Sequence, residues 1–287
     1  MNSNNMQHPN FFLRRIVPCV VGLAMAFFSF AQTEIGLQLY TFRNQIPKDI
    51  PGSFKMIREM GFHEIEGRGT YGMPLEDYKK LLADNGLKII SVGADFNELD
   101  KDPMIAVKEA KEFGAKYVVC FWIPHNGTDF TIDDVKKAVA VFDKAGKVLK
   151  ENGLSLCYHM HGYEFRPYQG GTLFDYMISQ LPADHFNFEM DVFWVKNPGQ
   201  DPVALLKKYP GRFPLMHLKD RKPGTENNQN GTADDQSNVV LGTGDVGIAE
   251  IMKTAKKTGT KHYFIEDESD RSVEQVPQSL KFLASLK

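Results

Sequence analysis

Three observations predict an α/β fold, namely a (β/α)8 TIM barrel. From residue 34 onward, short apolar or β-branched runs alternate with stretches in which apolar residues recur at helical spacing. Eight such strand–helix units fit into about 250 residues, the number and size typical of this barrel. No long polar linker divides residues 34 to 220, so we expect a single domain over residues 32–287. The competing fold, a doubly wound open sheet, often carries a glycine-rich phosphate turn after its first strand, and "YTFRNQIPKD" lacks it.

Eight runs predict the strands in chain order. β-branched and apolar residues dominate them, as they do in strands. The runs are "EIGLQLYTF" (34–42), "HEIEGRG" (63–69), "LKIISVGADF" (87–96), "KYVVCFW" (116–122), "LSLCYHMH" (154–161), "FNFEMDVFWV" (186–195), "FPLMHLKD" (213–220) and "KHYFIEDE" (261–268).

The helices between these strands are predicted by one apolar face and a closing glycine. In residues 53–62, Phe54, Ile57 and Met60 share a face and Gly61 ends the helix. The same arrangement recurs in residues 74–86, 133–153 and 247–259. The polar connection over residues 221–247 is unusually long for a compact domain. As the seventh strand-to-helix loop it would be either a lid or rim of the active face or a tolerated insertion.

The first 31 residues have a different character. "MNSNNMQHPNFFLRR" is polar and ends in Arg14 and Arg15, and "IVPCVVGLAMAFFSFA" is apolar, with small residues Ser29 and Ala31 at its end. This pattern predicts a cleavable signal peptide over residues 1–31, and therefore a periplasmic or secreted protein. A membrane anchor is the alternative, although the apolar run is shorter than the roughly 20 residues that a span requires. We expect no stable membrane span after cleavage.

Charge and cysteine content narrow the class of protein further. The formal net charge is -2, and no basic stripe is visible, which disfavours nucleic acid as a partner. Cys120 and Cys157 both lie in strand-like runs. In an exported protein they could form a disulfide or remain buried free thiols.

Polar residues gather where the predicted strands end, which is where this kind of barrel carries its active site. Polar groups buried there must be paired, solvated or bound to a metal. The candidates are Gln38, Tyr40, Arg43, Glu66, Arg68, Asp95, Trp122, His159, His161, Glu164, Asp191, Trp194, His217, Lys219, Glu266 and Glu268.

Four of these candidates predict a metal site. His159, Asp191, His217 and Glu266 come from four successive strands and should converge on one point. Two imidazoles and two carboxylates suit Mn, Zn, Co or Fe, whereas Mg fits this donor set less well. The alternative is a network of rim histidines that are hydrogen-bonded to carboxylates.

The chain resembles the xylose isomerase-like TIM-barrel superfamily, which contains sugar isomerases, ketose epimerases, inosose dehydratases and apurinic-site endonucleases. The resemblance covers about residues 34 to 286. It rests on an ordered set of motifs, "IGLQLYTFR", "YHMHGYEF", "MDVFWV", "HLKD" and "IEDE".

This resemblance implies a divalent ion held by a strand-five carboxylate, a strand-six Asp, a strand-seven His and a strand-eight Glu. Asp191, His217 and Glu266 match the last three. His159 stands where ketose epimerases place a Glu, and Trp194 where those enzymes often carry a His. The implied activity is a metal-dependent sugar isomerase or epimerase that acts on a keto or aldose sugar through an enediolate or enolate.

The His159 departure affects the expected mechanism, because epimerases move the proton with two metal-bound carboxylates. Here only Glu266 remains of that pair. Glu164, His161 or Lys219 could supply the second proton carrier, and Lys219 could also stabilise the oxyanion. Alternatively the reaction needs one face only, as in isomerisation, or in elimination from a keto-sugar or 3-keto-glycoside by a lyase or dehydratase.

For the substrate we expect a small neutral sugar or glycoside, since sugar phosphates are scarce outside the cytoplasm. Trp122 and Trp194 would form apolar walls for a sugar ring. Two other classes stay open, a phosphodiester-cleaving endonuclease-like enzyme and a non-catalytic sugar-binding barrel. The expected partners of the sugar hydroxyls are Gln38, Tyr40, Glu66, Arg68, Asp95 and Glu268.

Overall fold

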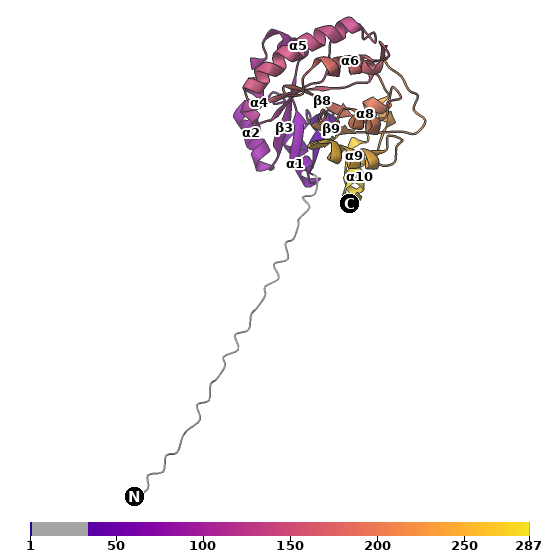
Figure 1. Cartoon of the computed structure of the whole chain (residues 1–287). Coiled ribbons are helices and arrows are strands. Elements are labelled where there is room, and N and C mark those ends of the chain that lie inside the picture. The colour runs from indigo at the N-terminus through magenta and orange to yellow at the C-terminus, as the bar shows by residue number, and fades with distance from the viewer. Residues whose placement is uncertain (2–33, 287) are drawn as a thin grey trace. The chain divides into compact units, whose positions relative to one another are not determined.

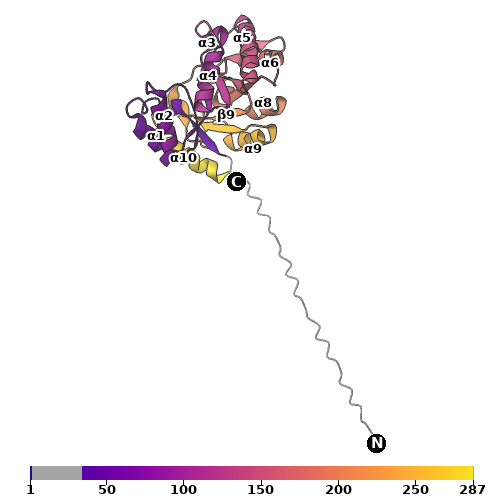
Figure 2. The same cartoon turned by 90° about the vertical axis from the view of Figure 1, so that its left-hand side faces the viewer.

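The structure of the protein, a computed structural model, describes Met1 and residues 34–286. Apart from Met1, the predicted signal peptide at residues 1–31 lies outside the described residues. The chain from Glu34 onward forms one compact unit. Its eight barrel strands are parallel and close in the order β1-β12-β9-β8-β5-β4-β3-β2, with the helices around the outside (Figures 1 and 2). The predicted (β/α)8 barrel is therefore confirmed.

The barrel strands coincide with the eight predicted runs. β1 begins at Ile35 and pairs with both β2 and β12, which closes the barrel. The strands are β1 (Ile35–Gln38), β2 (Glu64–Gly67), β3 (Lys88–Ala94), β4 (Tyr117–Cys120), β5 (Ser155–His159), β8 (Phe186–Asp191), β9 (Leu215–Leu218) and β12 (His262–Ile265). Two short hairpins lie outside the barrel, β6 (Pro167–Tyr168) with β7 (Gly171–Thr172) and β10 (Asp220–Arg221) with β11 (Asn238–Val239).

The helices cover the barrel on all the sides that Figures 1 and 2 show. They are α1 (Ile50–Glu59), α2 (Leu75–Asp84), α3 (Phe96–Lys101), α4 (Met104–Phe113), α5 (Ile132–Glu151), α6 (Leu173–Gln180), α7 (Val192–Lys196), α8 (Pro202–Lys208), α9 (Ile248–Thr258) and α10 (Ser272–Ser285). The glycines predicted to close α1 and α9, Gly61 and Gly259, both adopt φ +101°, a conformation that non-glycine residues rarely take. No helix in this described part combines the length and apolar character needed to cross a membrane.

An apolar floor fills the barrel interior below the ends of the strands. Tyr117, Val119, Cys157, Leu215 and Phe264 pack together as a cluster of their own. Side chains two residues apart on a strand share a face. Cys157, Leu215 and Phe264 therefore lie directly below three predicted site residues, His159, His217 and Glu266.

Two further details shape this interior. A Cβ atom on Gly36 of β1 would lie only 2.5 Å from the Phe264 ring, so only glycine fits here. Cys157 faces the interior, whereas Cys120 belongs to the core on the helix side of the barrel. Both are buried free thiols, so the disulfide alternative is wrong.

The long segment over residues 221–247 is a fixed part of the C-terminal rim. The buried carboxylate of Asp220 accepts hydrogen bonds from the backbone N–H groups of Gly242, Gly244 and Val246. Arg221 forms two hydrogen bonds to Asp245, at 3.0 and 2.9 Å. The segment also reaches neighbouring strand-end loops, since Arg43 donates to Asp235 and Arg166 donates to the carbonyl of Gln229. These contacts hold the segment against the strand-end loops of the barrel.

Candidate metal centre

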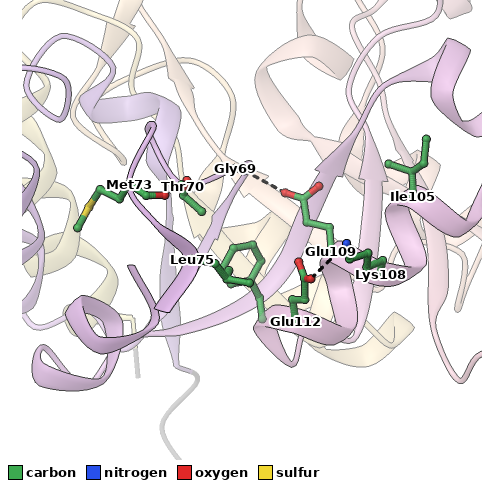
Figure 3. Close-up of a pocket in the computed structure, with 9 residues that line it drawn as sticks. Gly69, Thr70, Met73, Leu75, Ile105, Lys108, Glu109 and Glu112 are labelled. Atoms are coloured by element: carbon green, nitrogen blue, oxygen red, sulfur yellow. Dashed lines mark hydrogen bonds and ion pairs between the residues drawn. The ribbon is translucent and has the colours of Figure 1, made fainter. Parts of the chain in front are cut away.

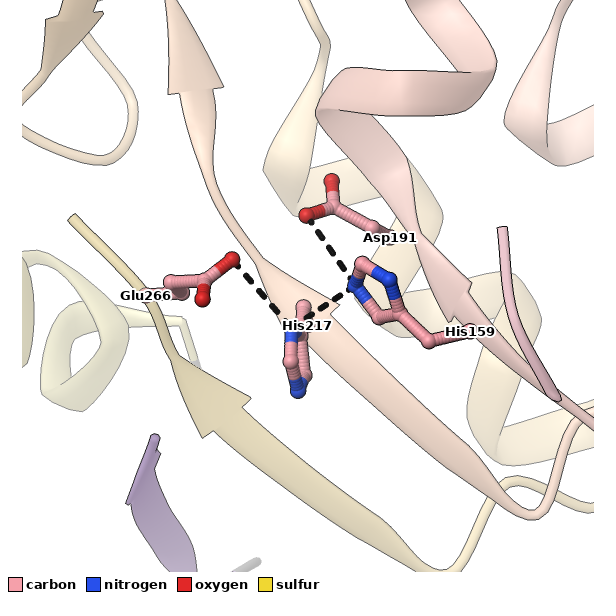
Figure 4. Close-up of side chains that lie close together, drawn as sticks. All are labelled: His159, Asp191, His217 and Glu266. Carbon is pink, nitrogen blue, oxygen red and sulfur yellow. Dashed lines mark hydrogen bonds and ion pairs between the residues drawn. The ribbon is translucent and has the colours of Figure 1, made fainter. Parts of the chain in front are cut away.

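Four buried side chains from four neighbouring strands converge at the C-terminal end of the barrel (Figure 4). His159 ends β5, Asp191 ends β8, His217 lies in β9 and Glu266 directly follows β12. The four strands are adjacent in the closed sheet, in the order β12-β9-β8-β5. One ligand atom from each residue lies within 4.8 Å of the other three. The structure thus brings together the four residues that the sequence analysis assigned to a metal.

The spacing of the ligand atoms fits a single ion. A tetrahedral ion with bonds of 2.0–2.2 Å holds its ligand atoms about 3.3–3.6 Å apart. His159 Nε2 lies 3.1 Å from His217 Nδ1 and 3.6 Å from Asp191 Oδ2. His217 Nδ1 lies 3.3 Å from Glu266 Oε2. Three edges of the required tetrahedron are therefore close to their ideal lengths.

Asp191 has a divided role, because its two oxygens face different partners. Oδ1 caps α7 by accepting hydrogen bonds from the N–H groups of Phe193 (2.8 Å) and Trp194 (3.1 Å). Oδ2 is buried and has no hydrogen-bond partner among the described residues. Burial raises the pKa of Asp191 to about 6. A buried carboxylate oxygen without a donor is costly, and a cation at this position would remove that cost.

The charges of the cluster are set by burial and by Lys219. Burial, together with the neighbouring His217, lowers the pKa of His159 to about 3, so this imidazole is neutral at pH 7. Burial raises the pKa of Glu266, but Lys219 and His217 outweigh burial and bring it well below its usual value. Lys219 Nζ lies 3.2 Å from Glu266 Oε2 and 2.5 Å from Glu268 Oε1. Glu266 is therefore ionised.

A second layer of polar residues lies on the far side of the His217 ring. His217 Nε2 is 2.6 Å from Glu66 Oε1 and 3.2 Å from Glu189 Oε2. Glu66 also accepts hydrogen bonds from Gln38 (2.7 Å) and from Ser91. We expected Gln38 and Glu66 to contact sugar hydroxyls. In the structure Glu66 faces the cluster residue His217, and Gln38 donates to Glu66.

Glu189 is the residue that sequence reasoning missed. It is fully buried in β8, and neither of its oxygens makes a well-aligned hydrogen bond within the described chain. Burial and the neighbouring Glu66 raise its pKa well above the usual value. Its signal in the sequence is its position two residues before Asp191, which puts both side chains on the same face of the strand.

Aromatic side chains lie beside the cluster. Trp122 is 45% exposed, stacks on His125 (ring centroids 4.7 Å apart) and meets the edge of His161 at 5.4 Å. The His161 ring lies 4.7 Å from the His159 ring and 5.8 Å from Trp194. His161 Nδ1 has no hydrogen-bond partner in the described structure. His161 therefore stands between the cluster and the aromatic wall.

Glu164 lies elsewhere, despite its closeness to His161 in sequence. Its carboxylate accepts hydrogen bonds from the hydroxyl of Tyr158 (2.5 Å) and from the N–H groups of His161 (3.1 Å) and Gly162 (2.7 Å). Tyr158 packs against Phe142 of α5, on the helix side of β5. Through these contacts Glu164 stabilises the loop after β5. The expectation that Glu164 could be a proton carrier is corrected accordingly.

The remaining predicted residues have partners outside the cluster, with Glu268 as the exception. Arg68 pairs with Glu98 (2.8 Å), and Asp95 caps α3 through the N–H groups of Asn97 and Glu98. Tyr40 is 54% exposed and lies under the guanidinium of Arg43. Among these expected sugar-binding residues, Glu268 is tied to the cluster through Lys219.

A separate hollow of about 390 Å³ opens between α4 and the loop after β2 (Figure 3). It is lined by residues such as Thr70, Ile105 and Phe113, and the N–H of Gly69 donates to Glu109 at 3.0 Å. None of the four cluster residues lines it. It is distinct from the candidate metal centre.

Comparison with known proteins gives one family and several similar structures. Residues 54–286 match the family described as xylose isomerase-like TIM barrel. No curated protein matches the chain. A sugar phosphate isomerase/epimerase structure from Parabacteroides distasonis is 24% identical, with a TM-score of 0.75, over 90% of this chain and 98% of the other.

Two more distant structures share the fold. The probable 3-DHS dehydratase of Bacillus anthracis is 16% identical, with a TM-score of 0.68, over 89% of this chain and all of the other. The IolI protein, whose structure contains a zinc atom, is 14% identical, with a TM-score of 0.68. The match covers 88% of this chain and 96% of the other. At these identities the likeness establishes the fold alone.

Proposed function

The chain belongs to the xylose isomerase-like TIM-barrel family, and on that premise we propose that it is a divalent-metal-dependent sugar isomerase or epimerase. The observation that supports this most is the convergence of His159, Asp191, His217 and Glu266, whose ligand atoms lie within 4.8 Å of one another. The proposed substrate is a neutral keto or aldose sugar, which reacts through an enediolate or enolate.

The four cluster residues would hold the ion, and Zn, Mn, Co or Fe suit their donor atoms better than Mg. When bound, the ion supplies Lewis-acid polarisation of the substrate carbonyl and stabilises the negative charge that develops on it. The donor set fits such an ion because it combines two imidazole nitrogens with two carboxylate oxygens in a buried site.

Glu266 is the proposed proton acceptor. Its carboxylate is ionised and lies at the open end of the barrel, where it can take a proton from the carbon next to the substrate carbonyl. Lys219 keeps it ionised through the 3.2 Å contact. Lys219 is fully buried and also 2.5 Å from Glu268, so its ammonium acts mainly on these two carboxylates.

The second proton carrier in this proposal is His161. Burial lowers its pKa well below the usual value, so the ring is neutral and has a free lone pair, although it binds a proton less strongly than an exposed imidazole. Its Nδ1 has no partner in the described part of the chain, and its ring lies between the cluster and Trp122. In this proposal a substrate that rests on the aromatic wall supplies the partner that this buried nitrogen lacks.

A neutral substrate is supported by the ion pairs that the positively charged side chains near the strand ends already form with carboxylates. Arg43 pairs with Asp235, Arg68 with Glu98, and Lys219 with Glu266 and Glu268. A phosphate group would have to compete with these carboxylates for each cation. A neutral sugar also agrees with the exported location predicted from residues 1–31, which stays a prediction.

One observation favours a second candidate, elimination by a lyase or dehydratase. Of the cluster residues, the one on β5 is the neutral His159, so Glu266 has no metal-ligating carboxylate opposite it on that strand. A reaction that removes a proton from one face and expels a β-substituent would need no second carboxylate. The nature of the product distinguishes this candidate from isomerisation.

Solvent deuterium exchange tests the proposed function. Protein loaded with Mn²⁺ or Zn²⁺ and given a panel of ketoses and aldoses in D₂O should place deuterium on the carbon next to the carbonyl, as followed by ¹H NMR. Isomerisation or epimerisation gives a new sugar, whereas elimination releases the β-substituent. The same protein after treatment with a chelator should show no exchange. Exchange that persists without metal, or its absence from every sugar with metal-loaded protein, would contradict the proposal.

A further inference from the structure

The two ring nitrogens of His217 face two different groups of residues. Nδ1 points into the cluster, 3.1 Å from His159 Nε2 and 3.3 Å from Glu266 Oε2. Nε2 points the opposite way, 2.6 Å from Glu66 Oε1 and 3.2 Å from Glu189 Oε2. The ring thus connects the cluster to a buried pair of carboxyl groups.

Only one protonation pattern of His217 allows it to bind an ion. A nitrogen that ligates a metal must offer its lone pair, so Nδ1 cannot carry a proton, and the remaining ring proton must reside on Nε2. Glu66 Oε1 is placed to accept that proton. A carboxylate in this position fixes both the tautomer and the orientation of the ring.

Glu66 is itself held in place as an acceptor. The backbone N–H of Tyr40 donates to Oε1 of Gln38 at 3.0 Å, so the amide nitrogen of Gln38 must be the atom that faces Glu66, at 2.7 Å. The hydroxyl of Ser91 donates to the other oxygen of Glu66. The pairing of β2 and β3 shifts register between Ile65 and Glu66, and this shift sets Ser91 directly beside Glu66.

The same residues are unsuited to a second ion. Glu66, Glu189 and His217 lie close enough together to hold a cation. However, His217 would have to ligate two ions at once, which requires both of its ring nitrogens to be deprotonated. Glu66 also already accepts hydrogen bonds from Gln38 and Ser91. The carboxyl pair is better suited to supporting His217 than to binding metal.

We infer that Glu66, fixed by Gln38 and Ser91, is a positioning residue that presents Nδ1 of His217 to the metal ion. Glu189 completes the polar environment of Nε2 from β8. This inference rests on the proposed metal dependence and changes the role that the sequence analysis gave to Glu66 and Gln38. Neither residue needs to touch the sugar.

The variant Glu66→Gln tests the inference through metal affinity. Titration of the metal-free protein with Zn²⁺ against a chromophoric chelator should give a Kd raised about 10- to 100-fold, the loss typical of second-layer partners of metal-binding histidines. Circular dichroism and thermal unfolding of the metal-free variant report whether it is folded. Ser91→Ala, a smaller change that removes one donor to Glu66, should give a loss of a few-fold and covers the case that Glu66→Gln does not fold.

Glu64→Gln is the matched control. Glu64 lies two residues earlier on β2 and pairs with Nδ1 of His262 at 2.9 Å, so this change breaks another carboxylate–histidine pair of the same strand. Its Zn²⁺ affinity should equal that of the wild type. A folded Glu66→Gln protein with wild-type affinity would overturn the inference, as would an equal loss in Glu64→Gln. A wild-type protein that binds no Zn²⁺, Mn²⁺ or Co²⁺ would overturn the proposed function along with it.

Discussion

Replacing Asp191 by Asn is expected to abolish divalent-metal binding while the protein remains folded. In the wild type, Oδ1 of Asp191 caps α7 by accepting hydrogen bonds from the N–H groups of Phe193 and Trp194. The amide oxygen of Asn can take over this cap. The amide nitrogen would then occupy the position of Oδ2 and direct N–H donors toward the ion. We expect the Kd for Zn²⁺, measured by calorimetric titration of the metal-free protein, to rise more than about 100-fold, beyond the usual effect of a second-layer change.

Asp95 offers a control with the same geometry. Its Oδ1 caps α3 by accepting hydrogen bonds from the N–H groups of Asn97 (2.8 Å) and Glu98 (3.1 Å), as Asp191 caps α7. Asp95→Asn should therefore carry any cost of the altered cap and leave the Zn²⁺ affinity unchanged. Equal affinities for Asp191→Asn and the wild type would show that Asp191 is not a ligand. An equal loss in Asp95→Asn would assign the effect to helix capping.

Replacing Glu266 by Gln is expected to lower kcat by about 10³-fold or more, within the usual range for general acid–base residues and in addition to any loss of metal. The amide cannot accept the proton, and the ion pair with Lys219 is lost. Turnover should be measured at saturating Mn²⁺, with metal content determined on the same sample, so that loss of the ion is separated from loss of the base.

Glu164→Gln provides the comparison for this variant. The donors to this carboxylate, Tyr158, His161 and Gly162, belong to β5 and the loop after it rather than to the cluster. The single oxygen of Gln keeps the hydrogen bonds to one of the two carboxylate positions and loses those to the other, so thermal unfolding of the variant must be measured alongside its kcat. Its kcat should stay within a few-fold of the wild type. Normal turnover in Glu266→Gln would remove Glu266 from the chemistry, and a large loss in Glu164→Gln would restore Glu164 to the list of proton carriers.

The barrel and the metal quartet could be predicted because both follow from short-range patterns. The strand and helix periods, with a glycine at several helix ends, define the units, and parallel strands in a closed barrel must end at the same face. Asp191, His217 and Glu266 lie at or within one residue of the C-terminal ends of successive strands. Their convergence therefore needed no knowledge of packing beyond the fold itself.

The second layer of polar residues, which contains Glu66 and Glu189, could not be predicted in the same way. Whether a polar residue near a strand end faces the substrate or the interior depends on the stagger between strands, and for Glu66 on the register shift beside Ile65. Glu189 was not predicted because it lies before the end of its strand. Its side chain nevertheless points into the barrel, because residues two apart on a strand, here Glu189 and Asp191, share one face. For Glu164, Gly162 at φ +94° turns the chain so that the carboxylate returns to the helix side.

The central claim is that one divalent ion binds between His159, Asp191, His217 and Glu266. Anomalous diffraction from a crystal soaked in Mn²⁺ tests it most directly, with data collected on either side of the manganese absorption edge. We expect one strong peak about 2.0–2.2 Å from a nitrogen or oxygen of each of the four side chains. A map without a peak at that point, or with its main peak elsewhere in the protein, would contradict the account.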